Sequence, residues 1–390
     1  MNCPLCENPS LVEVVGMDSV PVFCNVLYGT ATEARAATRG SIDLRFCPSC
    51  GLLVNTAFDE SLLDYSPEYD NSLHFSPRFR EFVGELVRHL VEDRGVSGGT
   101  VIEIGSGSGD FLSLLCEAGD NVGIGYDPSH DPHRAPPVAS DRVTVVSEPY
   151  PVDRPVEARL VCSQHVLEHL HQPSALDVLR GVRSSLTPGD GTLQYHEVPD
   201  ATYMVETGAI WDLIYEHVSY FAEPTLRALL GEAGFEVIDS GRSFGNQYLW
   251  VEAVTATGEG RSGGFDSVEL GRLPGLVERF GRLHRTTMEQ WERRLSVMLD
   301  EGEVVVWGAG SKGVSFLNQM SRAAEIARLV DVNPRKRGRH VPGTGQVIVA
   351  PADLVGSPPA HVIVMNPLYV DEVGQALAEL GVDSTVHSMG

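Results

Sequence analysis

Two Cys-x-x-Cys pairs near the N-terminus could hold a metal ion. Cys3 with Cys6 and Cys47 with Cys50 each carry a proline after the first cysteine, and Gly51 follows the second pair. Turns of this form point backbone amides at the sulfurs, and four thiolates match the tetrahedral preference of Zn²⁺. We predict a structural zinc site, because four thiolates leave no open position on the metal. A redox dithiol is the alternative.

A glycine-rich loop after an apolar run is the second candidate site. It contains Glu103, Gly105, Gly107 and Gly109, and Asp127 follows 22 positions after Gly105. Glycines permit a tight turn and let a ligand approach the backbone at a helix N-terminus. Asp127 ends the next expected strand and is placed to accept hydrogen bonds from ribose hydroxyls. Because alternating glycines are more typical of S-adenosylmethionine (SAM) sites than of NAD sites, we predict that this loop binds SAM.

Polar residues also follow the strand expected over 160–163. Ser163, Gln164 and His165 would lie at the carboxyl edge of a parallel sheet, where ligands bind. We expect them to contribute to the SAM site, with His165 on the methionine side. The alternative is that His165 only hydrogen-bonds to free backbone groups at the end of a helix.

Tyr215, Glu216 and His217 form the best candidate for proton transfer. A histidine titrates near neutral pH, and one flanked by a carboxylate and a phenol suits removal of a proton. The segment follows the fifth expected strand and should reach the same sheet edge. A histidine satisfied inside a core would give the same pattern.

A second glycine loop, at residues 307–313, follows a strand near the C-terminus and matches Gly-x-Gly-x-x-Gly. Asp331 ends the next expected strand, close to the interval of a dinucleotide site. Ser311, Lys312 and the loop amides could hold a diphosphate. The pattern leaves three interpretations open: NAD, a nucleotide diphosphate, or a loop that only packs.

Alternating strands and helices must position these groups, which predicts an α/β fold with a doubly wound sheet. Seven strands are expected in the central part, at residues 101–104, 122–126, 143–146, 160–163, 191–197, 235–240 and 247–254. A second α/β unit has strands expected at 304–307, 327–332, 346–349 and 361–365. We divide the chain into a zinc module (1–60), a helical connector (61–95), a SAM-binding domain (96–255), a linker with a packing helix (256–300) and a substrate-side domain (301–390).

Composition narrows the partners of the chain. Its 390 residues suit two or three domains, and 42% hydrophobic with 21% charged residues is typical of globular protein. A net charge of −24 repels phosphate backbones, so we expect no nucleic-acid partner. No apolar run approaches the roughly 18–20 residues that span a bilayer, and the N-terminus lacks a signal-peptide pattern. We therefore expect no membrane partner, a small-molecule substrate and a cytoplasmic location.

These motifs, in this order, resemble the sugar C-methyltransferases that act on nucleotide-linked deoxysugars in antibiotic pathways. The resemblance covers nearly the whole chain: the cysteine pairs, 103–110, 215–221, and 307–313 with 331–334. It implies a small zinc module, a central seven-stranded class I (Rossmann-like) methyltransferase domain and a C-terminal Rossmann-like domain on the substrate side.

The resemblance also implies residue roles. His217 would be the general base, with Glu216 and Tyr215 beside it, and Tyr69 is the nearest counterpart of a tyrosine that contributes ahead of the first long helix. Segment 245–249 reads Gly-Asn-Gln-Tyr-Leu where sugar-acting relatives tend to carry Gly-Gly-Ser-x-Arg. The expected substrate contacts are Ser311, Lys312, Asp331 and Asn246.

The sequence thus predicts an enzyme that uses SAM and a structural Zn²⁺ to methylate the carbon beside the ketone of a nucleotide-linked keto-deoxysugar. One alternative is C-, O- or N-methylation of a non-nucleotide small metabolite. An alternative of another class is an NAD-dependent oxidoreductase that uses the loop at 307–313.

Overall fold

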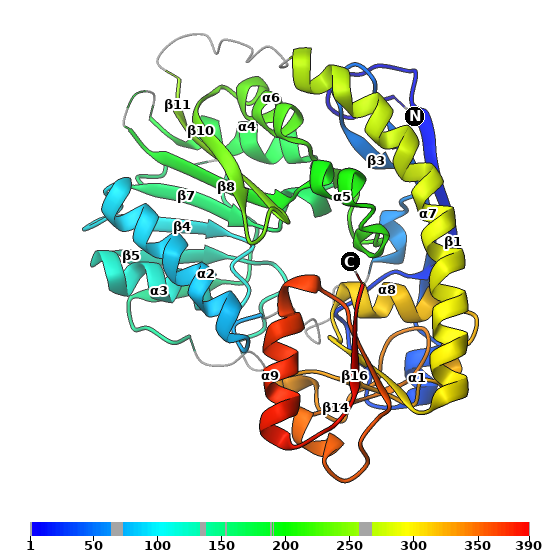
Figure 1. The fold of residues 1–390 in the computed structure, drawn as a ribbon. Helices are drawn as coiled ribbons and strands as arrows, with labels where there is room; N and C mark the ends of the chain where they lie inside the picture. The colour runs from blue at the N-terminus through cyan, green and yellow to red at the C-terminus, as the bar shows by residue number, and fades with distance from the viewer. Residues whose placement is uncertain are drawn as a thin grey trace.

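The computed structural model describes residues 2–63, 73–132, 138–152, 154–187, 189, 191–256 and 267–389, and Tyr69 lies outside these ranges. The chain forms three sheets that surround the middle of the molecule (Figure 1). No described helix is long and apolar enough to cross a membrane.

The central sheet has seven strands in the order β10-β11-β8-β7-β4-β5-β6, which confirms the predicted count. Five neighbouring strands, β8-β7-β4-β5-β6, pair in parallel, and β11 pairs antiparallel with both β8 and β10. The order reverses direction at β4, so the loops after β4 and β7 open at the point where such sheets bind ligands. The strands are β4 (Thr100–Ile104), β5 (Val122–Tyr126), β6 (Val143–Val146), β7 (Leu160–Gln164), β8 (Leu193–Pro199), β10 (Phe235–Ser243) and β11 (Tyr248–Thr255).

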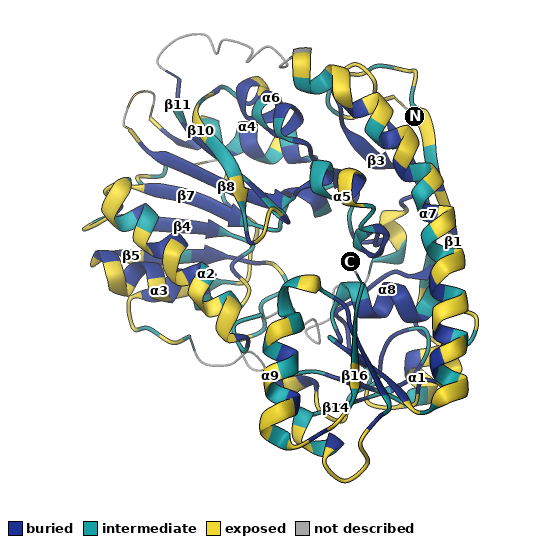
Figure 2. Cartoon of the chain, in the orientation of Figure 1, coloured by how far each residue is buried: buried dark blue, intermediate teal, exposed yellow. Residues whose placement is uncertain are grey.

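Helices cover both faces of this sheet, with buried inner sides and exposed outer sides (Figure 2). The first begins where the sequence indicates, since the Ser76 side chain accepts a hydrogen bond from the Phe79 amide and Pro77 takes the first turn. The helices are α2 (Pro77–Arg88), α3 (Asp110–Gly119), α4 (Ala175–Ser185), α5 (Ala201–Thr207) and α6 (Glu223–Glu232), with short turns η2 (His89–Asp93), η3 (Leu167–His169) and η4 (Ile210–Asp212).

The N-terminal sheet has the order β1-β2-β3-β9, and its last strand comes from far along the chain. β9 (Ser219–Tyr220) pairs with β3 through Leu53–Tyr220 and Val54–Ser219. The segment that carries His217 is therefore joined to the N-terminal module. The other elements are β1 (Val12–Pro21), α1 (Ala31–Arg35), β2 (Arg39–Phe46), β3 (Leu53–Asn55) and η1 (Glu60–Leu62).

A helix of 35 residues, α7 (Ser267–Glu301), runs along one side of the molecule beside β1 to the C-terminal domain (Figure 1). The C-terminal sheet is parallel, in the order β14-β13-β12-β15-β16. Its elements are β12 (Val304–Trp307), α8 (Ser311–Gln319), η5 (Ala323–Glu325), β13 (Arg328–Val330), η6 (Pro334–Lys336), β14 (Val347–Val349), η7 (Pro351–Leu354), β15 (His361–Val364), η8 (Pro367–Tyr369), α9 (Val370–Leu380) and β16 (Thr385–Ser388).

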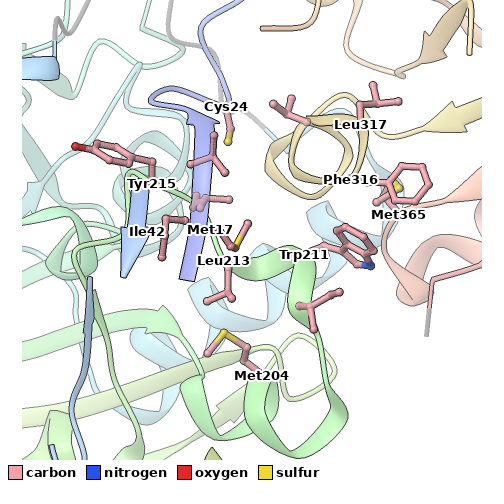
Figure 3. Packing of buried hydrophobic residues seen from close by; sticks show 14 of the residues in the cluster. Met17, Cys24, Ile42, Met204, Trp211, Leu213, Tyr215, Phe316, Leu317 and Met365 are labelled. Carbon is pink, nitrogen blue, oxygen red and sulfur yellow. The ribbon is translucent and has the colours of Figure 1, made fainter. Parts of the chain in front are cut away.

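One hydrophobic cluster joins the three parts of the chain (Figure 3). It packs Met17 and Ile42 of the N-terminal sheet with Trp211, just before the His217 segment, and with Phe316 and Met365 of the C-terminal domain. The Trp211 and Phe316 rings meet edge to face at 5.1 Å. Burial of this shared surface holds the domains around the site described next.

Candidate active-site cleft

A cleft of about 240 Å³ lies where the three parts of the chain meet. Asn25 of the N-terminal module lines it, together with residues of the central sheet edge and of the C-terminal glycine loop. Of the residues predicted from sequence, it brings together His165, His217, Ser311, Lys312 and Asp331.

The glycine loop after β4 forms the turn that leads into the N-terminus of α3. Gly107 has a φ of +55°, and no atom lies within 4 Å of the position a Cβ would take. Below it, Glu103 and Ser106 are buried, and Glu103 Oε2 and Ser106 Oγ have no hydrogen-bond partner among the described residues. Burial, with Asp127 and Asp110 nearby, raises the pKa of Glu103 well above its usual value. Open backbone and unpaired polar atoms fit the nucleoside part of SAM.

Asp127 ends β5 and turns back onto this loop. Its Oδ2 accepts a hydrogen bond from the Gly107 amide at 2.7 Å, and its Oδ1 accepts from the Ser129 amide at 2.8 Å. The Ser129 hydroxyl also donates to Oδ1 at 2.6 Å, so these bonds hold the side chain in position and leave the further lone pair of Oδ2 for a ribose.

The three polar residues at the end of β7, Ser163, Gln164 and His165, lie in different surroundings. The Ser163 hydroxyl bonds to His196 Nδ1 at 2.8 Å in the buried interior, whereas Gln164 is half-buried. His165 has a φ of +54°, lies in the cleft and touches the Tyr248 ring edge to face at 4.4 Å. Burial opposes its charged form, but Glu168 and Glu197 raise the pKa of His165 above its usual value.

The Tyr215 hydroxyl is not directed into the cleft. The side chain is buried, and its hydroxyl accepts from the Asp59 amide at 2.7 Å and donates to the Asp59 carbonyl at 3.2 Å. Glu216 is also buried, and its Oε2 accepts a hydrogen bond from the Cys24 amide at 2.9 Å. Both contacts fasten the segment to the N-terminal module, so the geometry gives no support to direct roles of Tyr215 and Glu216 in proton transfer.

His217 lines the cleft with Glu168 and His169. Two hydrogen bonds align the chain segments: the Val218 amide donates to the Glu168 carbonyl at 2.8 Å, and His169 Nδ1 donates to the Glu216 carbonyl at 3.0 Å. The His169 and His217 rings meet edge to face at 4.8 Å. Burial and the neighbouring His169 lower the pKa of His217 to about 3.

Glu168 is the carboxylate nearest to this histidine pair, and its side chain is 1% exposed. Its Oε1 lies 3.5 Å from His165 Nδ1. Burial would raise the pKa of Glu168, but the nearby histidines His165, His169 and His217 lower it below its usual value. The sequence alone does not mark Glu168 and His169 as site residues, because only the fold brings them close to His217.

The C-terminal loop faces the cleft from the opposite side. Ser311 opens α8, and the Lys312 ammonium pairs with Asp212 of η4. Asp331 accepts hydrogen bonds from the Ala309 amide at 2.9 Å and the Asn333 amide at 2.9 Å. Buried Lys336 lies 3.4 Å from the same carboxylate. Asp331 thus accepts a hydrogen bond from an amide of the 307–313 loop, as Asp127 does from an amide of the loop after β4.

The structure places Asn246 on the surface and its neighbour in the cleft. Asn246 is exposed and has a φ of +66°, whereas Gln247 lines the cleft. The side-chain amides of Gln247 and Asn366 exchange two hydrogen bonds of 2.9 Å, which link the central and C-terminal domains. A substrate contact in this segment is therefore available to Gln247, and the Asn246 prediction lacks geometric support.

The four predicted metal ligands converge away from the cleft. The sulfurs of Cys3, Cys6, Cys47 and Cys50 lie within 4.8 Å of one another, with Cys3–Cys50 and Cys6–Cys47 sulfur distances of 3.5 Å. Zn–S bonds of roughly 2.3 Å in a tetrahedron require sulfurs a little under 4 Å apart, so the donor set fits Zn²⁺. The Thr225 hydroxyl donates to the Cys50 carbonyl at 2.8 Å and docks the cluster on α6.

The order of the central sheet and its glycine loop define a class I methyltransferase. Residues 78–240 match the family model of a methyltransferase domain, and residues 275–385 match that of a C-methyltransferase C-terminal domain. The chain is therefore a SAM-dependent methyltransferase that carries a C-methyltransferase type of C-terminal domain. No curated protein matched its sequence.

Several solved structures resemble less than half of the chain. The 1,6-didemethyltoxoflavin-N1-methyltransferase of Burkholderia thailandensis is 19% identical, with 46% of this chain and 80% of that chain covered and a TM-score of 0.36. Magnesium protoporphyrin IX methyltransferase of Synechocystis PCC 6803 is 18% identical, with 46% and 84% covered and a TM-score of 0.35. The mitomycin 7-O-methyltransferase MmcR is 17% identical, with 45% and 53% covered and a TM-score of 0.36.

Proposed function

We propose that the enzyme methylates the carbon beside the ketone of a nucleotide-linked keto-deoxysugar, a natural-product intermediate of the antibiotic type. The observation that carries this proposal is the cleft, which is lined both by His217 and by Ser311 and Lys312 of the C-terminal loop. A substrate that spans it could present its reacting carbon to His217 and its phosphates to the C-terminal loop. The match of residues 275–385 to a C-methyltransferase domain agrees with a carbon acceptor.

His217 is the proposed general base. Its lowered pKa leaves the imidazole neutral at neutral pH, with a lone pair that can take the proton from carbon. The imidazolium that forms would be stabilised by ionised Glu168 rather than by Glu216, because Glu168 belongs to the same cluster. SAM, when bound, supplies the methyl group that the carbon acquires.

The electrons left by the proton move onto the ketone oxygen, and stabilising this oxyanion must supply several kcal/mol. Of the two lysines in the cleft, Lys312 is assigned to the phosphates, and Lys336 is held by the Ala309 carbonyl at 3.1 Å as well as by Asp331.

The same ion pairs favour a second candidate substrate class. Because Lys312 and Lys336 already have carboxylate partners, and Glu372 also lines the cleft, a diphosphate must displace at least one carboxylate to bind. A neutral, non-nucleotide metabolite, methylated at carbon, oxygen or nitrogen, would not meet this cost. NAD has less support, because residues 275–385 match a C-methyltransferase domain.

Calorimetric titration of dTDP into SAH-saturated protein distinguishes these substrates, where SAH is S-adenosylhomocysteine, the product of SAM. Saturable binding that is lost in Lys312→Ala and kept in Arg337→Ala supports the nucleotide sugar. Arg337 is a suitable control because it is exposed and pairs with Asp353, outside the cleft. Absence of heat at two temperatures would exclude the nucleotide and leave methyl transfer to another metabolite.

We also propose that Cys3, Cys6, Cys47 and Cys50 bind a structural Zn²⁺. The convergence of four sulfurs supports this proposal, and four thiolate ligands leave no position for a substrate. Metal analysis of the purified protein should find one zinc ion at this cluster. A folded wild-type protein that holds no metal at this cluster would contradict the proposal.

A further inference from the structure

A second group of metal-ligating side chains lies inside the cleft itself. Glu168, His169 and His217 each offer a ligand atom, and these atoms lie within 4.8 Å of one another. All three residues line the cleft, so a bound ion would be reachable from it. The cluster is separate from the four cysteines, which do not line the cleft.

Glu168 is the feature that distinguishes this cluster from a chance grouping. Its side chain is buried, yet neither carboxylate oxygen has a hydrogen-bond partner within the described ranges. Within the described ranges, His165 Nδ1 forms an ion pair with Oε1 at 3.5 Å. A buried carboxylate without hydrogen bonds is costly, and binding a cation removes that cost.

His169 is prepared as a ligand by its hydrogen bond. Its Nδ1 lies 3.0 Å from the Glu216 carbonyl, which can only accept, so the proton of the neutral ring is on Nδ1. The lone pair is then on Nε2. Metal-bound histidines in proteins are usually oriented by such a bond from the other ring nitrogen to a carbonyl or carboxylate.

We propose that Glu168, His169 and His217 bind a divalent transition-metal ion of the Zn²⁺ or Co²⁺ type, and that the bound ion inhibits the enzyme. Two imidazoles and one carboxylate suit these ions better than they suit Mg²⁺ or Ca²⁺, which prefer oxygen ligands alone. Three protein ligands leave at least one position on the ion open toward the cleft.

Inhibition follows from the chemistry of imidazole, and this part rests on the proposed role of His217 as base. A neutral imidazole has one nitrogen lone pair. If the metal takes that lone pair, none is left to accept the substrate proton. Metal binding and proton removal by His217 therefore exclude each other, and the active form of the enzyme is the one with a metal-free cleft.

Titration of the full-length, zinc-loaded protein with Co²⁺ alone tests the site. We expect one Co²⁺ to bind with visible d–d absorption and without the intense thiolate charge-transfer band that cobalt at the cysteines would give. Glu168→Gln and His169→Gln should each weaken binding by at least about 10–100-fold, the range found even for groups that only support a ligand. His171→Gln is the matched control, because His171 faces Glu60 at 3.4 Å and lies outside the cluster.

Each outcome decides the proposal. Absence of a second Co²⁺ site, or equal binding in wild type and both variants, overturns it; SAH titration of each variant checks that it is folded. Methyl transfer to a nucleotide-linked keto-deoxysugar should fall as Co²⁺ occupies the site and recover with a chelator. If Co²⁺ binds as expected but His217→Ala keeps full turnover, the metal site stands, and the base role and inhibition fall. Loss of turnover in His217→Ala without any Co²⁺ site would overturn the metal proposal alone.

Discussion

Two carboxylates near His217, Glu216 and Glu168, have different surroundings. Glu216 is the sequence neighbour, but it accepts a hydrogen bond from the Cys24 amide and secures the segment to the N-terminal module. Glu168 lies 49 positions earlier in the chain and joins His217 in the cleft. We infer that the nearest charge in space, rather than in sequence, stabilises the histidine when it takes a proton.

The role of His217 predicts a large loss of activity in His217→Ala. Removing a positioned base lowers the rate of proton transfer by roughly 10²–10⁴-fold. SAH affinity should be unchanged, because the glycine loop after β4 does not depend on this side chain. Methyl transfer and SAH titration measure the two effects, with His171→Ala as the control. Full turnover in His217→Ala would show that another group removes the proton.

Tyr215→Phe tests whether the phenol is catalytic or structural. The variant loses both hydrogen bonds to the Asp59 backbone, so we expect the free energy of unfolding to fall by about 1–3 kcal/mol, since each such bond contributes about 0.5–1.5 kcal/mol net. The turnover of the folded protein should stay near that of wild type. Denaturant unfolding and kcat are the measurements. A fall in kcat without a change in stability would show that the Tyr215 hydroxyl takes part in the reaction.

At the scale of elements, Gly105 and Gly107 of the SAM loop allow a matched comparison of two alanine substitutions. Both have left-handed backbone angles, with φ of +71° at Gly105 and +55° at Gly107. A Cβ at Gly105 would stand 2.3 Å from Val166 Cγ2, whereas one at Gly107 would meet no atom within 4 Å. An alanine would therefore have a strained backbone at both positions, but its Cβ would collide with a neighbour only at Gly105.

Gly107→Ala should lower stability by only about 1–2 kcal/mol, the cost of a left-handed alanine, but weaken SAH binding at least about tenfold. The added methyl group points into the space left for the ligand. Gly105→Ala should lower stability further, and Val166→Ala should restore part of that loss without helping Gly107→Ala. Thermal unfolding and SAH titration distinguish these effects. Equal SAH affinity in wild type and Gly107→Ala would place the ligand elsewhere.

Local patterns predict the strands of the central and C-terminal sheets well, because buried strands such as β4 and β12 are short apolar runs between turn residues. The same reasoning misses β16, whose residues Thr385–Ser388 include no buried side chain. It also misses β9, two residues long, because that strand exists only through its pairing with β3. The two glycine loops could be predicted because each is one continuous segment that follows a strand.

The surroundings of His217 and Lys312 could not be predicted in the same way, because they depend on contacts between segments that are distant in the sequence. The Val218 amide meets the Glu168 carbonyl, and Lys312 meets Asp212, 100 positions away. Glu168 reads in sequence as a residue that caps a turn. Only the packing of η3 against the 215–221 segment makes it part of the site.

At the scale of the whole molecule, the cleft depends on three parts that are tied together at several points. Gln247 pairs with Asn366, and the Ser76 hydroxyl donates to Glu372 of α9 at 2.9 Å. The N-terminal module holds the His217 segment through β9. The four-cysteine cluster, although remote from the cleft, should therefore control the geometry of the base.

Cys47→Ser should separate cofactor binding from activity. Loss of a thiolate weakens the proposed zinc site, and zinc binding provides much of the folding free energy of such small modules. Strand β3 follows Cys47 directly and carries β9, so hydrogen exchange should rise over 53–55 and 215–221.

Methyl transfer in this variant should fall while SAH binding persists, because the SAM loop belongs to the central sheet. Cys116→Ala is the control, since it alters a buried cysteine of the core around α3, away from the cluster, and should leave zinc content unchanged. Zinc analysis, hydrogen exchange and SAH titration are the measurements. If Cys47→Ser lost its zinc but kept protection over 215–221, the module would hold the base segment by packing alone, because the metal would then contribute nothing to the position of His217.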